Sequence, residues 1–292
     1  MKPPVFDYEA PTGVDEALAV LADRGLDGKV LAGGQSLVPL LNFRLARPEV
    51  LIDINRVQEL AYLRREDGAL RIGAMTRQAA AERSPLVRES WPLITKALRW
   101  VAHPQIRNRG TIGGSAAHAD PAAEIPVVLA ALDARFHVRS VRAARTLDAG
   151  EMFAGQLQSA VDADELLVEI QVPPLPPGAG CAFEEFARRH GDFALGGAAA
   201  VVALDDAGSV EHAAIALLGA GPTPVRAVAA EQVLAGRMVD DEAAREAAAE
   251  AVRGIRPTGD IHGSSEYRRD LIEAMTRRAL LRAAADARGE AA

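Results

Sequence analysis

The chain has 292 residues, which is too long for one ordinary hydrophobic core and long enough for two domains. Its composition, 49% hydrophobic and 25% charged, is typical of a globular protein, and the net charge of −7 argues against a nucleic-acid partner or an anionic membrane surface. No apolar run is long enough to span a bilayer, and the N-terminus is not a secretory signal. We therefore expect a cytoplasmic protein without a transmembrane segment.

A single cysteine, Cys181, limits the redox chemistry that the chain can carry out alone. One cysteine cannot form an intramolecular disulfide, hold an iron–sulfur cluster or supply a cysteine-rich zinc site. Electrons transferred by this protein must therefore be carried by an organic cofactor or by another chain. We expect Cys181 to be a small core residue, and we predict no metal ligands.

The first half of the chain alternates short strands with helices. Thr12 is a candidate cap for a helix that runs through Leu21. Apolar strands are predicted at Lys29–Ala32, Leu51–Ile54 and Leu70–Gly73, and an alanine-rich helix follows Thr76. Two pairs of a cap residue and a proline predict further helix starts, the second opening the helix Ile125–Leu132: Ser84-Pro85 and Asp120-Pro121.

The second half begins with an alternating strand, Leu166–Val172, whose Leu166, Val168, Ile170 and Val172 we expect on one face. The segment PPLPPG at 173–178 then interrupts the pattern and predicts a boundary between domains 1–176 and 177–292. Two strands joined by a turn are predicted beyond it, followed by three helices: Leu195–Leu204, Val210–Leu218, Arg226–Leu234, Asp241–Val252 and Tyr267–Ala287. The predicted fold is a larger α+β domain followed by a smaller α+β domain.

Two glycine turns are the segments most suited to binding a ligand. Val30–Leu37 (VLAGGQSL) takes a strand through two glycines into an apolar run, and Thr111–Ser115 (TIGGS) has the same ingredients. Glycine permits close approach to the backbone, and free N–H groups before a helix form a cradle for phosphate. The carboxylates of Asp120 and Glu124 follow the second turn and could accept hydrogen bonds from sugar hydroxyls. Two cradles suit a dinucleotide.

A structural explanation stays open for each of these features. A glycine pair after a strand is usually only a tight connection, and Asp120 could serve only as a helix cap. His103 and His118 have no nucleophile or metal-ligand pattern beside them. The basic run Arg107–Arg109 could attract a pyrophosphate or lie in a solvated loop.

The two turns, in this order and at this separation, resemble a known family. AGGQSLVPLLNFRLARPEVLIDIN (Ala32–Asn55) and RNRGTIGGSAAHADPAAEIP (Arg107–Pro126) are similar to the FAD-binding medium subunits of the molybdenum hydroxylases, the xanthine dehydrogenase and aerobic carbon monoxide dehydrogenase group. FARRHGDFALGGAAAVVAL (Phe186–Leu204) and SSEYRRDLIEAMTRRAL (Ser264–Leu280) extend the resemblance over nearly the whole chain. It implies a two-subdomain FAD-binding domain of the PCMH/VAO type, followed by a C-terminal domain like that of the carbon monoxide dehydrogenase flavoprotein.

The resemblance also implies a role for individual residues. Both turns would hold the FAD pyrophosphate, Asp120 and Glu124 would stand near the ribityl or ribose hydroxyls, and Phe193 beside Asp192 would cover the flavin ring. Val101 and Leu167 would pack against the flavin or adenine. Phe193 replaces a tyrosine common in the family, and Glu184 replaces a lysine of some relatives. The implied cofactor-binding residues are Val30, Leu31, Ala32, Gly33, Gly34, Gln35, Ser36, Leu37, Val101, Thr111, Ile112, Gly113, Gly114, Ser115, Asp120, Glu124, Leu167, Asp192 and Phe193.

The implied function is electron transfer, with no catalytic side chain expected. FAD would receive electrons from iron–sulfur clusters of a [2Fe-2S] small subunit, after substrate oxidation on a molybdopterin-binding large subunit, and would pass them to an external acceptor. The three chains would form a heterotrimer or a dimer of heterotrimers. Two alternatives stay open: a stand-alone FAD-dependent oxidoreductase, and a dimerising or ligand-binding protein that has lost the cofactor.

Overall fold

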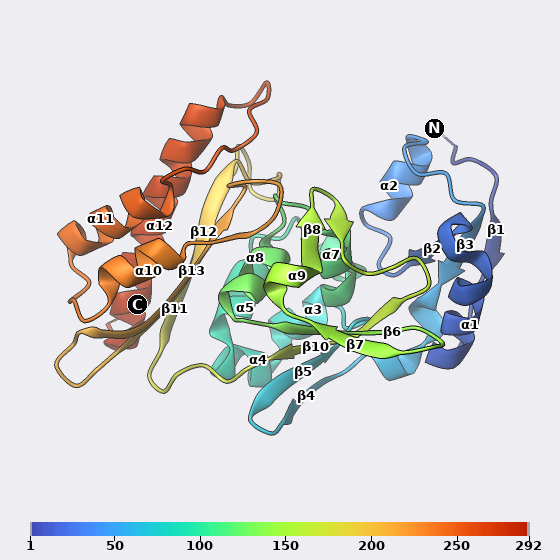
Figure 1. Ribbon diagram of the computed structural model, residues 1–292, viewed down its shortest axis with the longest axis horizontal. Coiled ribbons are helices and arrows are strands. Elements are labelled where there is room, and N and C mark those ends of the chain that lie inside the picture. The colour runs from blue at the N-terminus through green and yellow to red at the C-terminus, as the bar shows by residue number, and fades with distance from the viewer. Residues whose placement is uncertain (1, 291–292) are drawn as a thin grey trace.

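The computed structural model describes residues 2–290. It contains three sheets of three, five and four strands and a two-stranded hairpin, with helices packed against them, so the fold is α+β as predicted (Figure 1). The three larger sheets follow one another along the chain, with the N-terminal sheet at one end of the molecule and the C-terminal sheet and helices at the other.

The N-terminal subdomain is a small parallel sheet of order β1-β3-β2. Leu31 pairs with Asp53 at the ends of two parallel strands, so the segments that follow both strands leave the sheet at the same edge. Its elements are β1 (Asp7–Glu9), α1 (Val14–Arg24), β2 (Gly28–Leu31), α2 (Leu37–Asn42) and β3 (Val50–Asp53). The core of this subdomain is formed mainly by Leu18, Leu21 and Ile52.

The second subdomain is built on a five-stranded antiparallel sheet of order β4-β5-β10-β6-β7. Its strands and the adjoining hairpin are β4 (Leu63–Glu66), β5 (Ala69–Gly73), β6 (Arg135–Arg139), β7 (Ala144–Leu147), β8 (Phe153–Gly155), β9 (Gln158–Ser159) and β10 (Leu166–Val172). Its helices are α3 (Gln78–Arg83), α4 (Pro85–Ser90), α5 (Pro92–Leu98), α6 (Pro104–Arg107), α7 (Ile112–His118), α8 (Glu124–Ala131) and α9 (Ala149–Met152).

The C-terminal part is a sheet of order β11-β12-β13-β14 covered by helices. These elements are β11 (Gly180–Phe186), β12 (Gly196–Leu204), β13 (Val210–Leu218), β14 (Val225–Arg226), α10 (Val228–Leu234), α11 (Asp241–Ala251) and α12 (Ser265–Ala287). Residues 173–178 connect β10 to β11, and we propose that the domain boundary lies there. The long helix α12 packs along β11 and β12 (Figure 1).

The strand β10 corrects one prediction. Its pairing with β6 shifts register between Leu167 and Glu169, so a bulge interrupts the alternation. Leu166 packs in the N-terminal core, whereas Ile170 and Val172 pack in the central core. The prediction that all four alternating residues share one face is therefore wrong, because the extra residue turns the strand between two cores.

Two predicted helix starts differ from the structure. α1 is capped by Gly13, and Thr12 instead donates its N–H to Glu16 at 2.7 Å. α8 begins at Glu124 with Ala123 at the cap position, and the carboxylate of Asp120 accepts the N–H of Ala122 within the preceding turn. In contrast, Ser84 caps α4 with proline at the first position, as predicted.

The seam between the second subdomain and the C-terminal sheet is a continuous apolar core. Cys181 and Phe183 on β11 belong to the same buried cluster as Leu98 of α5 and Val128 of α8. The two parts therefore pack as one body. None of the helices in the range 2–290 is long and apolar enough to cross a membrane.

Candidate functional site

The first glycine turn leaves a row of backbone donors unused. The backbone N–H groups of residues 33–36 donate to no protein acceptor within residues 2–290. Gly34 has φ of +75°, a conformation that glycine adopts without strain. Ser36 precedes α2, but its hydroxyl makes no capping hydrogen bond. Four successive free donors on a tight turn form a surface suited to an anion.

The second glycine turn lies directly against the first. A Cβ atom on Gly33 would lie 2.6 Å from the carbonyl oxygen of Arg109 and 2.7 Å from the Cα of Gly110. A Cβ atom on Gly114 would lie 3.5 Å from the Cβ of Ala32. The fold therefore brings together the two segments that the sequence singled out.

The second turn differs from the first in its backbone donors. Thr111 caps α7, and its Oγ1 accepts the N–H of Gly114 at 3.0 Å. The N–H groups of Ile112, Gly113 and Ser115 donate to the carbonyls of Thr76, Ala74 and Thr111. The N–H groups of this segment therefore donate within the protein, whereas those of the first turn remain without an acceptor.

A network of polar side chains, Asn55 and Arg77, holds the backbone of the first turn in place. The Asn55 amide donates to the carbonyl of Ala32 at 2.8 Å and accepts from Arg77 at 2.6 Å. Arg77 also donates to the carbonyl of Arg109. Burial, together with the charge of Arg109, lowers the pKa of Arg77. Asn55 and Arg77 received no role from sequence, although a polar residue just after β3 lies where parallel strands place ligands.

The basic run at 107–109 separates into two roles. Arg107 is buried and pairs with Glu82 at 2.8 Å, while donating to the carbonyl of Val101 at 2.9 Å. The guanidinium of Arg109 is exposed and forms no hydrogen bond or ion pair with the described residues. Arg107 is therefore structural. Arg109 is an exposed cation whose carbonyl lies against Gly33 and whose charge acts on Asp53 and Arg77, at the edge of the first turn.

Three ionisable groups lie between the last residue of α7 and the first residue of α8: His118, Asp120 and Glu124. Burial lowers the pKa of His118. Glu124 is the first residue of α8 and is 9% exposed, and burial raises its pKa to about 7 with a further contribution from Asp120. Pro121 accepts the N–H of Gly219, which joins this segment to the C-terminal sheet. The predicted carboxylates thus lie at the seam between the domains.

A second buried carboxyl group, missed in the sequence, faces this seam. Glu185 on β11 is 5% exposed, and neither of its oxygens has a hydrogen-bond partner in the range 2–290. Glu184 points to the opposite side of the sheet, where it pairs with Arg282 of α12. The strand pattern CAFEEF could have indicated that one of two adjacent glutamates must be buried.

The two predicted apolar contacts, Val101 and Leu167, are both buried in the central core, at 8% and 4% exposure. Val101 lies beyond the end of α5. Both residues belong to the central core, and their contact with a cofactor stays a prediction.

The loop between β11 and β12 lies against the end of α5. Gly191 has φ of +87°, and a Cβ atom there would lie 2.6 Å from the ring of His103. The rings of Trp100 and His190 have centroids 6.1 Å apart. Asp192 lies 3.6 Å from Arg188, and the side chain of Phe193 is 76% exposed. An exposed phenylalanine on a glycine-containing loop is available to cover a bound ring.

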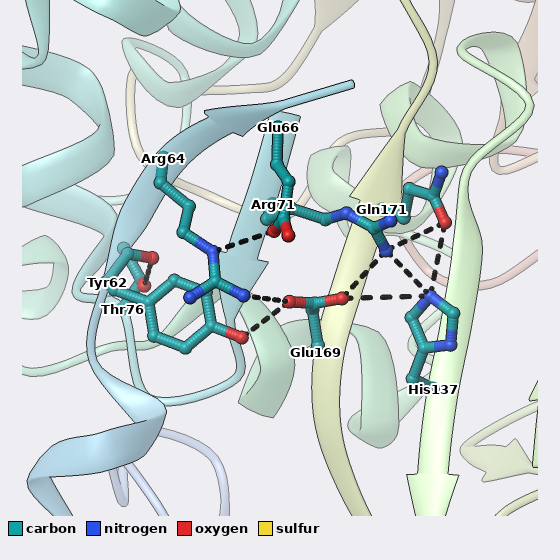
Figure 2. Close-up of polar contacts among 8 residues, drawn as sticks. All are labelled: Tyr62, Arg64, Glu66, Arg71, Thr76, His137, Glu169 and Gln171. Carbon is teal, nitrogen blue, oxygen red and sulfur yellow. Dashed lines mark hydrogen bonds and ion pairs between the residues drawn. The ribbon is translucent and has the colours of Figure 1, made fainter. Parts of the chain in front are cut away.

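A separate polar cluster lies on the five-stranded sheet (Figure 2). Glu169 accepts hydrogen bonds from Tyr62 at 2.6 Å and Arg71 at 2.9 Å, and Arg71 also donates to Gln171 at 2.9 Å. A pocket of about 280 Å³ adjoins it, lined in part by His137 and Arg139. The positive and negative side chains pair across neighbouring strands, so we interpret the cluster as stabilising strand pairing.

Comparison with known proteins covers both parts of the chain. The family described as the FAD binding domain in molybdopterin dehydrogenase matches residues 4–175, and the CO dehydrogenase flavoprotein C-terminal domain matches residues 181–283. The chain is 49% identical to the 6-hydroxypseudooxynicotine dehydrogenase complex subunit alpha of Paenarthrobacter nicotinovorans, covering 97% of this chain and 96% of the relative. It is 44% identical to the caffeine dehydrogenase subunit beta of a Pseudomonas species, with the same coverage of each.

A solved structure has the same fold. A chain of the carbon monoxide dehydrogenase from Hydrogenophaga pseudoflava superimposes with a TM-score of 0.95 at 41% identity, covering 98% of this chain and 99% of that one. The similarity therefore extends over both the glycine turns and the C-terminal sheet.

Proposed function

Because the chain belongs to the family of FAD-binding medium subunits of the molybdopterin dehydrogenases, we propose that it transfers electrons from the iron–sulfur clusters of a partner subunit to an external acceptor. The partners are a [2Fe-2S] small subunit and a molybdopterin-binding large subunit, together forming a heterotrimer in the cytoplasm. The relatives' names include subunits of dehydrogenase complexes, which supports an assembly of this kind. When bound, FAD can accept electrons singly and release them in pairs.

The observation that carries the proposal is the row of free backbone donors at residues 33–36 beside the exposed cation of Arg109. We assign the FAD pyrophosphate to these donors, within the turn Val30–Leu37. The amides there point to no protein acceptor, so a phosphate oxygen can accept from them without breaking a hydrogen bond of the fold. Arg109 adds a positive charge at the same place.

The turn Thr111–Ser115 takes a supporting role in this proposal. Its glycines permit the close packing of the two turns, and Thr111 fixes their backbone. Of its polar groups, the Ser115 hydroxyl forms no hydrogen bond with the described residues and is available to a phosphate oxygen. The two turns then act as one cradle.

The remaining predicted residues would hold the other parts of the cofactor. α7 leads from the second turn to Asp120 and Glu124, to which we assign the cofactor hydroxyls. We assign Phe193, with Asp192, to the exposed edge of the flavin, and Val101 and Leu167 to the apolar floor. These carboxylates and apolar groups position the cofactor, and the chain needs no side-chain acid or base for electron transfer.

The test is the visible absorption spectrum of the purified full chain, with the cofactor identified after release by acid. We expect one FAD per chain and no turnover of small substrates by the chain alone. A colourless chain that also fails to bind added FAD would contradict the proposal, and substrate turnover by the isolated chain would favour a stand-alone flavoenzyme. Co-expression with tagged partner subunits tests the assembly, which predicts that all three chains elute together.

A further inference from the structure

Glu185 projects from β11 into the seam between the two domains. Cys181 and Phe183, which lie four and two residues earlier on the strand, belong to the central core that crosses the seam, so this face of the strand is apolar. Directly opposite on β12 is Gly197, where a Cβ atom would lie 2.9 Å from the Cβ of Glu185. The glycine therefore leaves the space that the glutamate side chain occupies.

Gly197, the partner of Glu185, pairs with Leu218 on β13, and the N–H of the next residue, Gly219, donates to the carbonyl of Pro121, three residues before Glu124. Across this seam the charge of Glu124 acts on Glu185. α8 packs against β12 and β13, and Glu124 is its first residue. Asp120 acts in turn on Glu124, and the neighbouring strand contributes Gly197, which carries no charge. The ionic partner Arg282 lies on the other face of the sheet, with Glu184. The pair Glu124–Glu185 thus has no cation to compensate it in the described chain.

Two ionised carboxylates cannot both be stable in such a place. Transfer of one charge into an apolar interior is already strongly unfavourable when the charge has no partner. A second like charge nearby adds repulsion that weak screening does not remove. The neutral form of one carboxyl group avoids both costs.

We propose that Glu124 and Glu185 form a buried pair that binds one proton at neutral pH, and that Glu185 is a positioning residue that, while neutral, keeps Glu124 ionised and free to accept hydrogen bonds from FAD hydroxyls. The second half of this inference rests on the proposed function, which places Glu124 at the cofactor. Burial and the charge of Glu124 raise the pKa of Glu185 to about 8, above the value of about 7 for Glu124. Glu124 is therefore the first of the two to ionise.

The first experiment tests whether the pair Glu124–Glu185 binds one proton, and it uses the full chain without FAD. Carboxyl ¹³C NMR of glutamate-labelled protein follows each titration, assigned with Glu124→Gln and Glu185→Gln. We expect two coupled titrations near neutral pH, and we expect Glu124→Gln to lower the pKa of Glu185 because one negative charge is gone. Two carboxylates that are both ionised at pH 6, or a Glu185 titration unaffected by Glu124→Gln, would overturn the proposal.

The positioning role is tested by the dissociation constant of FAD between pH 7 and pH 9. For the wild type we expect affinity to fall about tenfold as Glu185 ionises, because its new negative charge repels the Glu124 carboxylate from the position in which it accepts the cofactor hydroxyls. Tenfold is the effect of roughly one pKa unit of coupling. Glu185→Gln should bind FAD with a nearly flat profile over this range, since glutamine stays neutral. Glu184→Gln, one residue away on the opposite face, is the matched control and should keep the wild-type profile.

The outcomes separate the two proposals. A wild-type chain that binds no FAD at any pH contradicts the proposed function, whereas the NMR result still decides whether the pair holds a proton. A wild-type chain that binds FAD with the same pH profile as Glu185→Gln contradicts the positioning role alone.

Discussion

Gly33 packs against the backbone of Gly110, so closely that a Cβ atom on Gly33 would lie 2.7 Å from the Cα of Gly110. This contact joins two turns that are more than seventy residues apart in the sequence. In the sequence, the glycines of this turn were interpreted as residues that permit a ligand to approach the backbone closely. The structure shows that a side chain at Gly33 would first clash with the protein itself.

Replacing Gly33 with alanine should therefore affect both folding and cofactor retention. We expect the free energy of unfolding to fall by about 1–3 kcal/mol, as for other overpacked sites, and the ratio of FAD to protein to fall with it. Thermal unfolding and the visible spectrum measure the two effects. Gly221→Ala is the control, because a Cβ atom there would lie 3.7 Å from Cγ2 of Val225, an ordinary van der Waals contact. An unchanged melting temperature in Gly33→Ala would show that the turns can separate without cost.

Arg107 and Arg109 should give opposite results when each is replaced with alanine. Arg109→Ala should weaken FAD binding by about tenfold and reduce its salt dependence without lowering stability, because it removes an exposed, unpaired charge. Arg107→Ala should lower the free energy of unfolding by about 2 kcal/mol, because it leaves Glu82 without its ion-pair partner and the Val101 carbonyl without its donor. FAD titration and denaturant unfolding of both variants test this division. Equal FAD affinity in Arg109→Ala and wild type would exclude Arg109 from the site.

Glu185 makes stability depend on pH in a defined direction. Its pKa rises from 4.5 to about 8 on folding, so the unfolded chain loses this proton first as the pH increases. The free energy of unfolding is unaffected below pH 4.5, falls between pH 4.5 and 8, and has lost the full contribution above pH 8. Glu185→Gln removes this loss.

We therefore expect Glu185→Gln to be more stable than the wild type at pH 9, by on the order of 3 kcal/mol, and nearly equal to it at pH 4.5. Denaturant unfolding at the two pH values measures the difference. A difference that does not grow with pH would mean that Glu185 is already ionised in the folded chain.

Cys181 should be unreactive while the chain is folded. It is buried in the seam, and burial raises the pKa of its thiol to about 12. A thiol-specific reagent at pH 8 should label the native chain very slowly and the denatured chain completely, because the thiolate is the reactive form. Rapid stoichiometric labelling of the native chain would show that the seam opens in solution.

The sequence by itself determined the local elements and the kind of site. Glycine pairs after apolar strands located both turns, and alternation or helical periodicity placed β10, β12, β13 and the C-terminal helices close to their observed ends, because these signals depend on neighbouring residues. The resemblance of the turns to a family led to FAD. Helix starts without a side-chain cap, such as that of α8, carried no such signal and were misplaced.

Only the tertiary structure decided which polar groups remain free. The amides of Gly33 and Gly113 look alike in sequence. The N–H of Gly113 donates to the carbonyl of Ala74, whereas the N–H of Gly33 has no acceptor in the range 2–290. Glu184 and Glu185 are adjacent and chemically identical, yet Glu184 pairs with Arg282, whereas Glu185 is buried and its oxygens have no hydrogen-bond partner among residues 2–290. Hydrogen bonding and charge compensation depend on partners that are distant along the chain, and a strand reverses its face at every residue.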